Sequence, residues 1–188
     1  MERFANALTR KLLLHGYIDD DQTEWCHYAI AHRCMNVISF MLLVLVGSVI
    51  MNWCAAVLFT LAFRFLRVRT GGYHAKTPYT CLLTALSVQI IALLFAQYIA
   101  YSWIFGVTAL ISVIIILKLA PANNAAIHLT REEMDALRPT IWRRVFIVLV
   151  GGGVLLLGND MVGGGSLIVA LAADAVLLVL SVIGLGVQ

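Results

Sequence analysis

The chain has 188 residues, of which 62% are hydrophobic and 12% are charged, and its formal net charge is +3. Soluble globular domains are roughly 45–50% apolar, so this composition excludes a soluble domain and predicts a single integral membrane domain over residues 1–188. The small excess of basic residues is explained by membrane topology, because Lys and Arg gather in cytoplasmic loops. We therefore expect the lipid bilayer, and no nucleic acid, as a partner.

The first expected element is an amphipathic helix over residues 1–14. Phe4, Leu8 and Leu12 recur at helical spacing, and basic residues fall on the opposite side. A helix of this kind lies in the plane of the membrane surface. Residues 1–22 are therefore predicted to form an interfacial segment, after which a second helix begins.

Residues 27–187 are expected to form an all-helical bundle of about six transmembrane helices. The number of crossings made by residues 36–63 decides the topology, because one crossing would place the basic groups before and after it on opposite sides of the membrane. The positive-inside rule disfavours that arrangement. A tight hairpin at Met51-Asn52-Trp53 keeps both basic groups in the cytoplasm, and the alternative is four or five spans with a re-entrant hairpin. The expected spans are residues 27–50, 53–68, 81–100, 103–120, 142–157 and 165–187.

Small and polar residues interrupt the later spans. The glycine run at 151–153 is interpreted as close helix packing, and the run at 163–165 as part of a flexible external turn. Asp174 lies in an apolar run, and an acid inside a membrane is a candidate functional residue. A protonated or hydrogen-bonded packing role for Asp174 is the alternative.

Residues 64–81 bring together basic, glycine, histidine and cysteine residues, and we expect them to contain a cytoplasmic loop that carries chemistry. Gly71 and Gly72 allow the backbone to turn sharply. Pro78 follows a threonine and is typical of the first residue of a helix. Cys81 is then about one turn inside that helix, where the helix dipole and nearby basic residues favour its thiolate.

Cys81 and His74 form the candidate catalytic pair. His74 lies seven residues before Cys81, and because Pro78 breaks any continuous helix between them, the loop can fold the imidazole back toward the sulfur. A cysteine beside a histidine is the minimal activated thiol. The alternative is an interfacial histidine and an ordinary apolar thiol.

No metal or other cofactor is expected. His27 and His32 are five residues apart, so they do not share a helix face and are poorly spaced to bind one ion together with Cys26 and Cys34. We expect all four cysteines to be free thiols: Cys26, Cys34, Cys54 and Cys81.

The segment 67–81 resembles the signature of the accessory gene regulator B family of membrane cysteine peptidases. Arg67, Gly71-Gly72-Tyr73-His74-Ala75-Lys76 and Cys81 are similar to the family's Arg, Gly-Gly-x-His-Ala and Cys seven residues after the His. The resemblance implies an endopeptidase that cuts a short precursor peptide at the plasma membrane of a Gram-positive bacterium. It also implies that the new carboxyl end is joined to an internal side chain, which gives a cyclic quorum-sensing pheromone.

The resemblance further implies roles for individual residues. Cys81 would be the nucleophile and His74 its general base, while the third member of a triad is not identified, because Gln89 lies about 12 Å along the helix from Cys81. The implied partners are a precursor with an amphipathic N-terminal helix and an acidic tail, and a second copy of the chain. A non-enzymatic transporter or sensor scaffold is the competing function. The supporting or substrate-binding residues are Arg67, Arg69, Gly71, Gly72 and Lys76.

Overall fold

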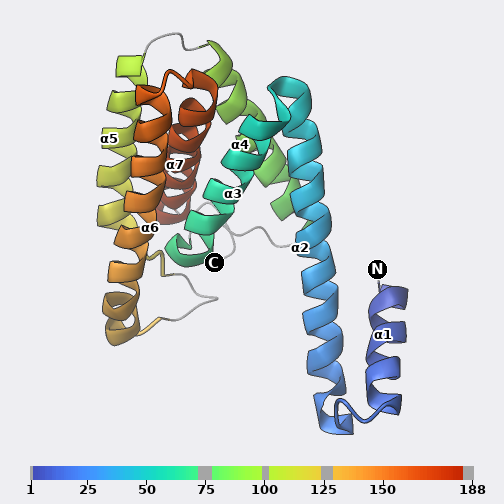
Figure 1. Ribbon diagram of the computed structural model, residues 1–188. Helices are drawn as coiled ribbons and strands as arrows, with labels where there is room; N and C mark the ends of the chain where they lie inside the picture. The colour runs from blue at the N-terminus through green and yellow to red at the C-terminus, as the bar shows by residue number, and fades with distance from the viewer. Residues whose placement is uncertain (1, 72–77, 99–101, 124–128, 184–188) are drawn as a thin grey trace. The chain divides into compact units, whose positions relative to one another are not determined.

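The computed structural model describes residues 2–71, 78–98, 102–123 and 129–183, and these parts of the chain form helices without a strand (Figure 1). The expected all-helical fold is confirmed. The elements are α1 (Glu2–Leu14), the 3-10 helix η1 (Asp20–Gln22), α2 (Thr23–Ile50), α3 (Trp53–Thr70), α4 (Pro78–Tyr98), α5 (Ser102–Leu119), α6 (Arg131–Leu157) and α7 (Met161–Val182).

Within the described ranges, four helices are long and apolar enough to cross a membrane, namely α2, α4, α6 and α7. The polytopic membrane protein expected from the composition is therefore confirmed. α5 is apolar but shorter, and the second half of α3 carries Arg64, Arg67 and Arg69. Whether α3 and α5 also cross, which would give the six expected spans, stays a prediction.

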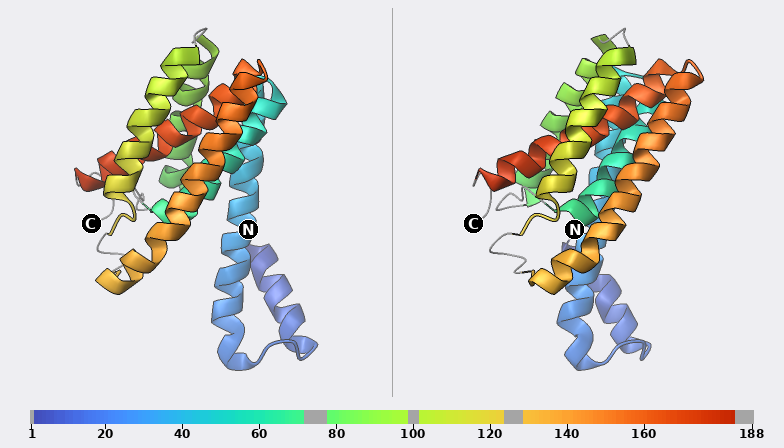
Figure 2. Two further views of the ribbon diagram at one scale, coloured as in Figure 1. Left: turned by 60° about the vertical axis from the view of Figure 1, so that its left-hand side comes forward. Right: turned by 90° about the vertical axis from the view of Figure 1, so that its left-hand side faces the viewer.

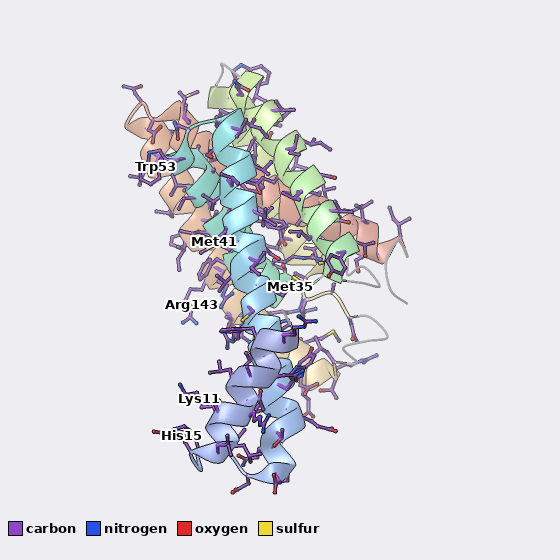
Figure 3. All side chains as sticks on the ribbon, turned by 90° about the vertical axis from the view of Figure 1, so that its right-hand side faces the viewer. Lys11, His15, Met35, Met41, Trp53 and Arg143 are labelled. Atoms are coloured by element: carbon purple, nitrogen blue, oxygen red, sulfur yellow. The ribbon has the colours of Figure 1, made fainter. Side chains whose placement is uncertain are left out.

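Contacts divide the chain into two compact units, and the first comprises residues Met1–Leu42. It holds the expected N-terminal helix, α1, which ends at a turn where the His15 ring nitrogen Nδ1 lies 2.8 Å from the Lys11 carbonyl oxygen. Figure 3 shows Lys11 on the last turn of α1 and His15 just after the end of this helix. Phe4 is 61% exposed and Leu8 is also exposed. These uncovered apolar side chains agree with the expected interfacial placement, which stays a prediction.

The second unit, Leu43–Gln188, is organised around α7. This helix packs against α3, α4, α5 and α6 and runs obliquely through the bundle (Figure 2). Its sequence is apolar on all sides, which is typical of a helix in the centre of a bundle. Residues buried along its whole length, among them Val169, Leu171 and Leu178, form the core with α3 and α5.

The glycine run 163–165 lies inside the first turns of α7 and is buried, so the interpretation as a flexible turn is wrong. A Cβ at Gly165 would lie 2.8 Å from the Phe105 ring, and one at Gly164 would lie 2.9 Å from the Gly152 carbonyl oxygen. Glycine is therefore present here because α5 and α6 approach the α7 backbone closely, as small residues permit between membrane helices.

Polar residues at the helix ends define the connections. The expected hairpin after α2 is confirmed, because Asn52 caps α3 and its Oδ1 accepts a hydrogen bond of 2.8 Å from the Ala55 N–H. Asp160 caps α7 in the same way, through a bond of 2.9 Å from the Gly163 N–H. α6 begins well before residue 142, where we expected a span to start, because Thr130 and Glu133 form a capping box.

Candidate functional site

The site is built at the C-terminal end of α3, just before the expected catalytic segment. The helix ends at Thr70, and Gly71 follows with a φ of 71°, a left-handed conformation that favours glycine. The Gly71 N–H donates to the Arg67 carbonyl oxygen over 3.2 Å, and the Arg67 guanidinium donates back to the Gly71 carbonyl oxygen. The prediction that Gly71 shapes the turn is therefore supported by its backbone geometry.

Thr70 joins the end of α3 to two other parts of the fold. Its hydroxyl donates to Asp174 Oδ1 on α7 over 3.0 Å. Its carbonyl oxygen accepts a hydrogen bond of 2.9 Å from the Ala122 N–H, just after α5. Thr70 is 1% exposed and Asp174 is fully buried, so this junction is shielded from solvent.

Asp174 is therefore placed beside the site. One carboxyl oxygen accepts from Thr70, while Oδ2 is buried and has no hydrogen-bond partner among the described atoms. The charges of Asp174 and Arg67 are close enough to interact. The structure thus shows a hydrogen-bonded acid at the end of α3, and its functional role stays a prediction.

Cys81 lies at the start of α4, which begins at Pro78 as expected. The thiol belongs to a residue that is exposed in the structure. The Arg67 guanidinium is close enough to Cys81 for a thiolate there to interact with it electrostatically. Arg67 thus lies within electrostatic range of both the candidate nucleophile on α4 and the buried acid on α7.

Further basic residues extend this region onto α6. Arg69 is exposed, and its positive charge is close enough to that of Arg144 for the two to repel each other. The Arg144 guanidinium lies 4.5 Å above the ring of Phe65 and donates to the Phe65 carbonyl oxygen. Its neighbour Arg143, labelled in Figure 3, contributes another charge to the same stretch in the middle of α6. The grouping agrees with the expectation that these two basic segments lie on one side of the membrane.

Three of the expected site residues lie outside the described part of the chain. These are Gly72, His74 and Lys76. The distance between His74 and Cys81 is therefore not given by the structure, and their pairing stays a prediction.

Gln89, which the sequence placed too far from Cys81 to complete a triad, has a different partner. It is fully buried, and its Nε2 donates to the Leu43 carbonyl oxygen of α2 over 2.8 Å. Gly47 leaves room for this amide, because a Cβ there would collide with the Gln89 Nε2. Gln89 therefore links α4 to the last turns of α2, at Leu43.

Thr70 was not singled out by sequence reasoning. A threonine directly before a glycine at a helix end gives a local signal for a cap, but the partner on α7 is 104 residues away. Nothing local indicates such a pairing. Across the described ranges, no three His, Cys, Asp or Glu side chains come together in a way that would bind a metal ion.

Comparison with known protein families gives a match for this chain. The family model described as "Accessory gene regulator B" matches residues 1–182. No curated protein and no solved structure matches the chain. The family match includes the end of α3, the start of α4 and the segment between them.

Proposed function

Since the chain belongs to the accessory gene regulator B family, which acts in the processing of autoinducer peptides in quorum sensing, we propose that it is a membrane-embedded cysteine endopeptidase. Its substrate is a short precursor peptide, and its product is a cyclic pheromone. Cys81 is the nucleophile and His74 is the general base. The exposed Cys81 thiol within electrostatic range of Arg67 is the observation on which this proposal rests.

The first step is an acyl transfer to the enzyme. His74 takes the proton from the Cys81 sulfur, and the thiolate attacks the carbonyl carbon of the scissile peptide bond. The carbon–nitrogen bond then breaks, and the leaving amine of the C-terminal tail takes the proton from His74. A thioester joins the remaining precursor to Cys81.

The second step closes the ring. A thiol or hydroxyl group within the precursor attacks the thioester carbon, a new thiolactone or lactone forms, and the Cys81 sulfur leaves and regains a proton. Exchange between thioesters is nearly balanced in free energy, so the site must hold the internal nucleophile close and exclude water. The position of Cys81 at the start of an apolar membrane helix supports this requirement.

Arg67 has a specific role in this scheme. A cation beside the sulfur stabilises the thiolate, and later it stabilises the negative charge that develops on the carbonyl oxygen. The hydrogen bond from its guanidinium to the Gly71 carbonyl oxygen holds the side chain at the end of α3. We further propose that Arg69 and Lys76 attract the acidic tail of the precursor on the cytoplasmic side of the plasma membrane.

The test is mass spectrometry of a candidate precursor incubated with the protein in lipid vesicles. The precursor would have an amphipathic N-terminal helix and an acidic tail. The variants are Cys81→Ala and His74→Ala, and the matched control is Cys54→Ala, because Cys54 is also an exposed cysteine near the start of a helix.

We expect release of the tail by the unchanged chain and by Cys54→Ala, an acyl adduct on Cys81, and no release by the other two variants. The mass of the product distinguishes a linear peptide from a ring. Cleavage that survives Cys81→Ala would overturn the mechanism, and transport of an intact precursor would favour a non-enzymatic membrane carrier.

A further inference from the structure

Asp174 requires an explanation, because a buried acid in an apolar helix is costly. Leu171 and Leu178, on the same helix, are also fully buried. They show that an apolar side chain is sufficient for packing at a buried position of α7. One oxygen of Asp174 has no hydrogen-bond partner among the described atoms, and an unsatisfied buried polar atom destabilises the fold. An acid in this setting is expected to have a functional role.

The neighbours of Asp174 indicate what that role is. Thr70 and Arg67 both belong to the last turn of α3, and the next residue, Gly71, begins the segment that leads to Cys81. The Thr70 carbonyl oxygen also accepts from the Ala122 N–H. The point where the catalytic segment leaves α3 is therefore held from α7 through a side chain and from the chain after α5 through the backbone.

We propose that Asp174 and Thr70 are positioning residues, which fix the end of α3 and keep the Arg67 guanidinium within electrostatic range of Cys81. The inference rests on the proposed function for its activity readout, but the placement of Arg67 near the sulfur is tested separately. Asp174 contributes a hydrogen-bond acceptor for Thr70 and lies within electrostatic range of Arg67.

Thr70 differs from an ordinary helical threonine in having this distant acceptor. Its hydroxyl lies 3.0 Å from Asp174 Oδ1 and 3.3 Å from the Leu66 carbonyl oxygen of its own helix. Thr60, on the same helix, donates only within α3, to the Ala56 carbonyl oxygen over 2.7 Å. Both threonines are 1% exposed, so Thr60 is a matched control for the loss of a buried hydroxyl.

The first experiment measures kcat and KM for precursor cleavage by Thr70→Val, Thr70→Ser and Thr60→Val in vesicles. We expect Thr70→Val to lower kcat at least tenfold with KM within about twofold, because the precursor still binds while the sulfur and cation are misaligned. Thr70→Ser keeps the hydroxyl and should restore most of kcat. A loss by Thr70→Val no larger than that of Thr60→Val would overturn the inference.

The second experiment needs no substrate. The ratio of alkylation rates at Cys81 for the anionic reagent iodoacetate and the neutral reagent iodoacetamide reports positive charge near the sulfur. Mass spectrometry of the peptide that contains Cys81 separates it from the other thiols. We expect the ratio to fall at least threefold in Asp174→Asn and in Thr70→Val, and to stay unchanged in Thr60→Val.

The two experiments separate failure of this inference from failure of the proposed function. If even the unchanged chain cleaves no precursor but the ratio falls as expected, the positioning role stands and the peptidase proposal fails. An unchanged ratio in Thr70→Val overturns the positioning role whatever the cleavage result. If Asp174→Asn does not fold, the comparison of Thr70→Val with Thr70→Ser and Thr60→Val still tests the positioning role.

Discussion

The backbones of α6 and α7 approach so closely that a Cβ atom at Gly164 would lie 2.9 Å from the carbonyl oxygen of Gly152. The same Cβ would lie 2.6 Å from Leu156 Cγ. This approach lets α7 lie in the centre of the bundle, and α7 in turn carries Asp174 to the end of α3. Helix packing at one end of α7 and the candidate site near its middle are thus parts of one arrangement.

Gly164→Ala is expected to destabilise the bundle. The added methyl group would meet backbone and the half-buried Leu156, and overpacking of this kind costs about 1–3 kcal/mol. Gly153→Ala is the matched control, because a Cβ at Gly153 meets nothing within 4 Å and alanine favours a helix by about 1 kcal/mol over glycine. The thermal unfolding temperature in detergent should therefore fall for Gly164→Ala and rise for Gly153→Ala. Equal shifts in the two variants would contradict the close approach of α6 and α7.

The helices were predictable because their signals are local. Long apolar runs, the hairpin expected at Met51-Asn52-Trp53 and the proline at position 78 indicated where helices begin and end. The capping box of Thr130 and Glu133 is also present in the sequence, yet the expected span was placed only from residue 142, so the early start of α6 was missed.

The candidate site was predictable only in part. Residues 67–81 are contiguous and carry a recognisable motif, whereas the partnership of Thr70 with Asp174 depends on how α7 packs against α3. Apolar periodicity cannot reveal that packing, because α7 is apolar on every side. The glycine run 163–165 was misinterpreted for a related reason, since glycine is frequent both in turns and at close helix contacts.

Gly71→Ala is expected to impair activity more than folding. Alanine at a φ of 71° is strained by about 1–2 kcal/mol, and its Cβ would lie 3.2 Å from the Ala122 carbonyl oxygen. Gly16→Ala also places alanine at a positive φ, 70°, but with nothing within 4 Å of the new Cβ. Precursor cleavage should fall at least tenfold only for Gly71→Ala, and similar cleavage by both variants would count against a shaping role for Gly71.

Cys81 is expected to react faster with iodoacetamide at neutral pH than Cys54 does. Both residues are exposed and lie within the first four residues of a helix, so they share the effect of the helix dipole. Arg67 is within electrostatic range of Cys81, and the proposed base, His74, is seven residues away in sequence. His74→Ala should slow the reaction of Cys81 with iodoacetamide severalfold and leave the rate at Cys54 unchanged, as measured by peptide mass spectrometry.

Equal rates at the two cysteines, or equal slowing of both by His74→Ala, would contradict activation of Cys81. Such a result would instead support an anchoring role for residues 64–81 in a non-enzymatic protein. The buried Cys26 provides an internal reference, because it should react slowly in every variant that folds.

The native cysteines also test the number of spans. If α3 crosses the membrane after the hairpin, Cys54 lies at the outer surface and Cys81 at the cytoplasmic surface. A membrane-impermeant maleimide should then label Cys54 and leave Cys81 unlabelled in intact cells. The variant Asn159→Cys, at the turn between α6 and α7, should be labelled and confirms that the reagent reaches the outer face. Labelling of Cys81 together with Cys54 would mean that α3 does not cross, and the proposed cytoplasmic position of the catalytic segment would then be wrong.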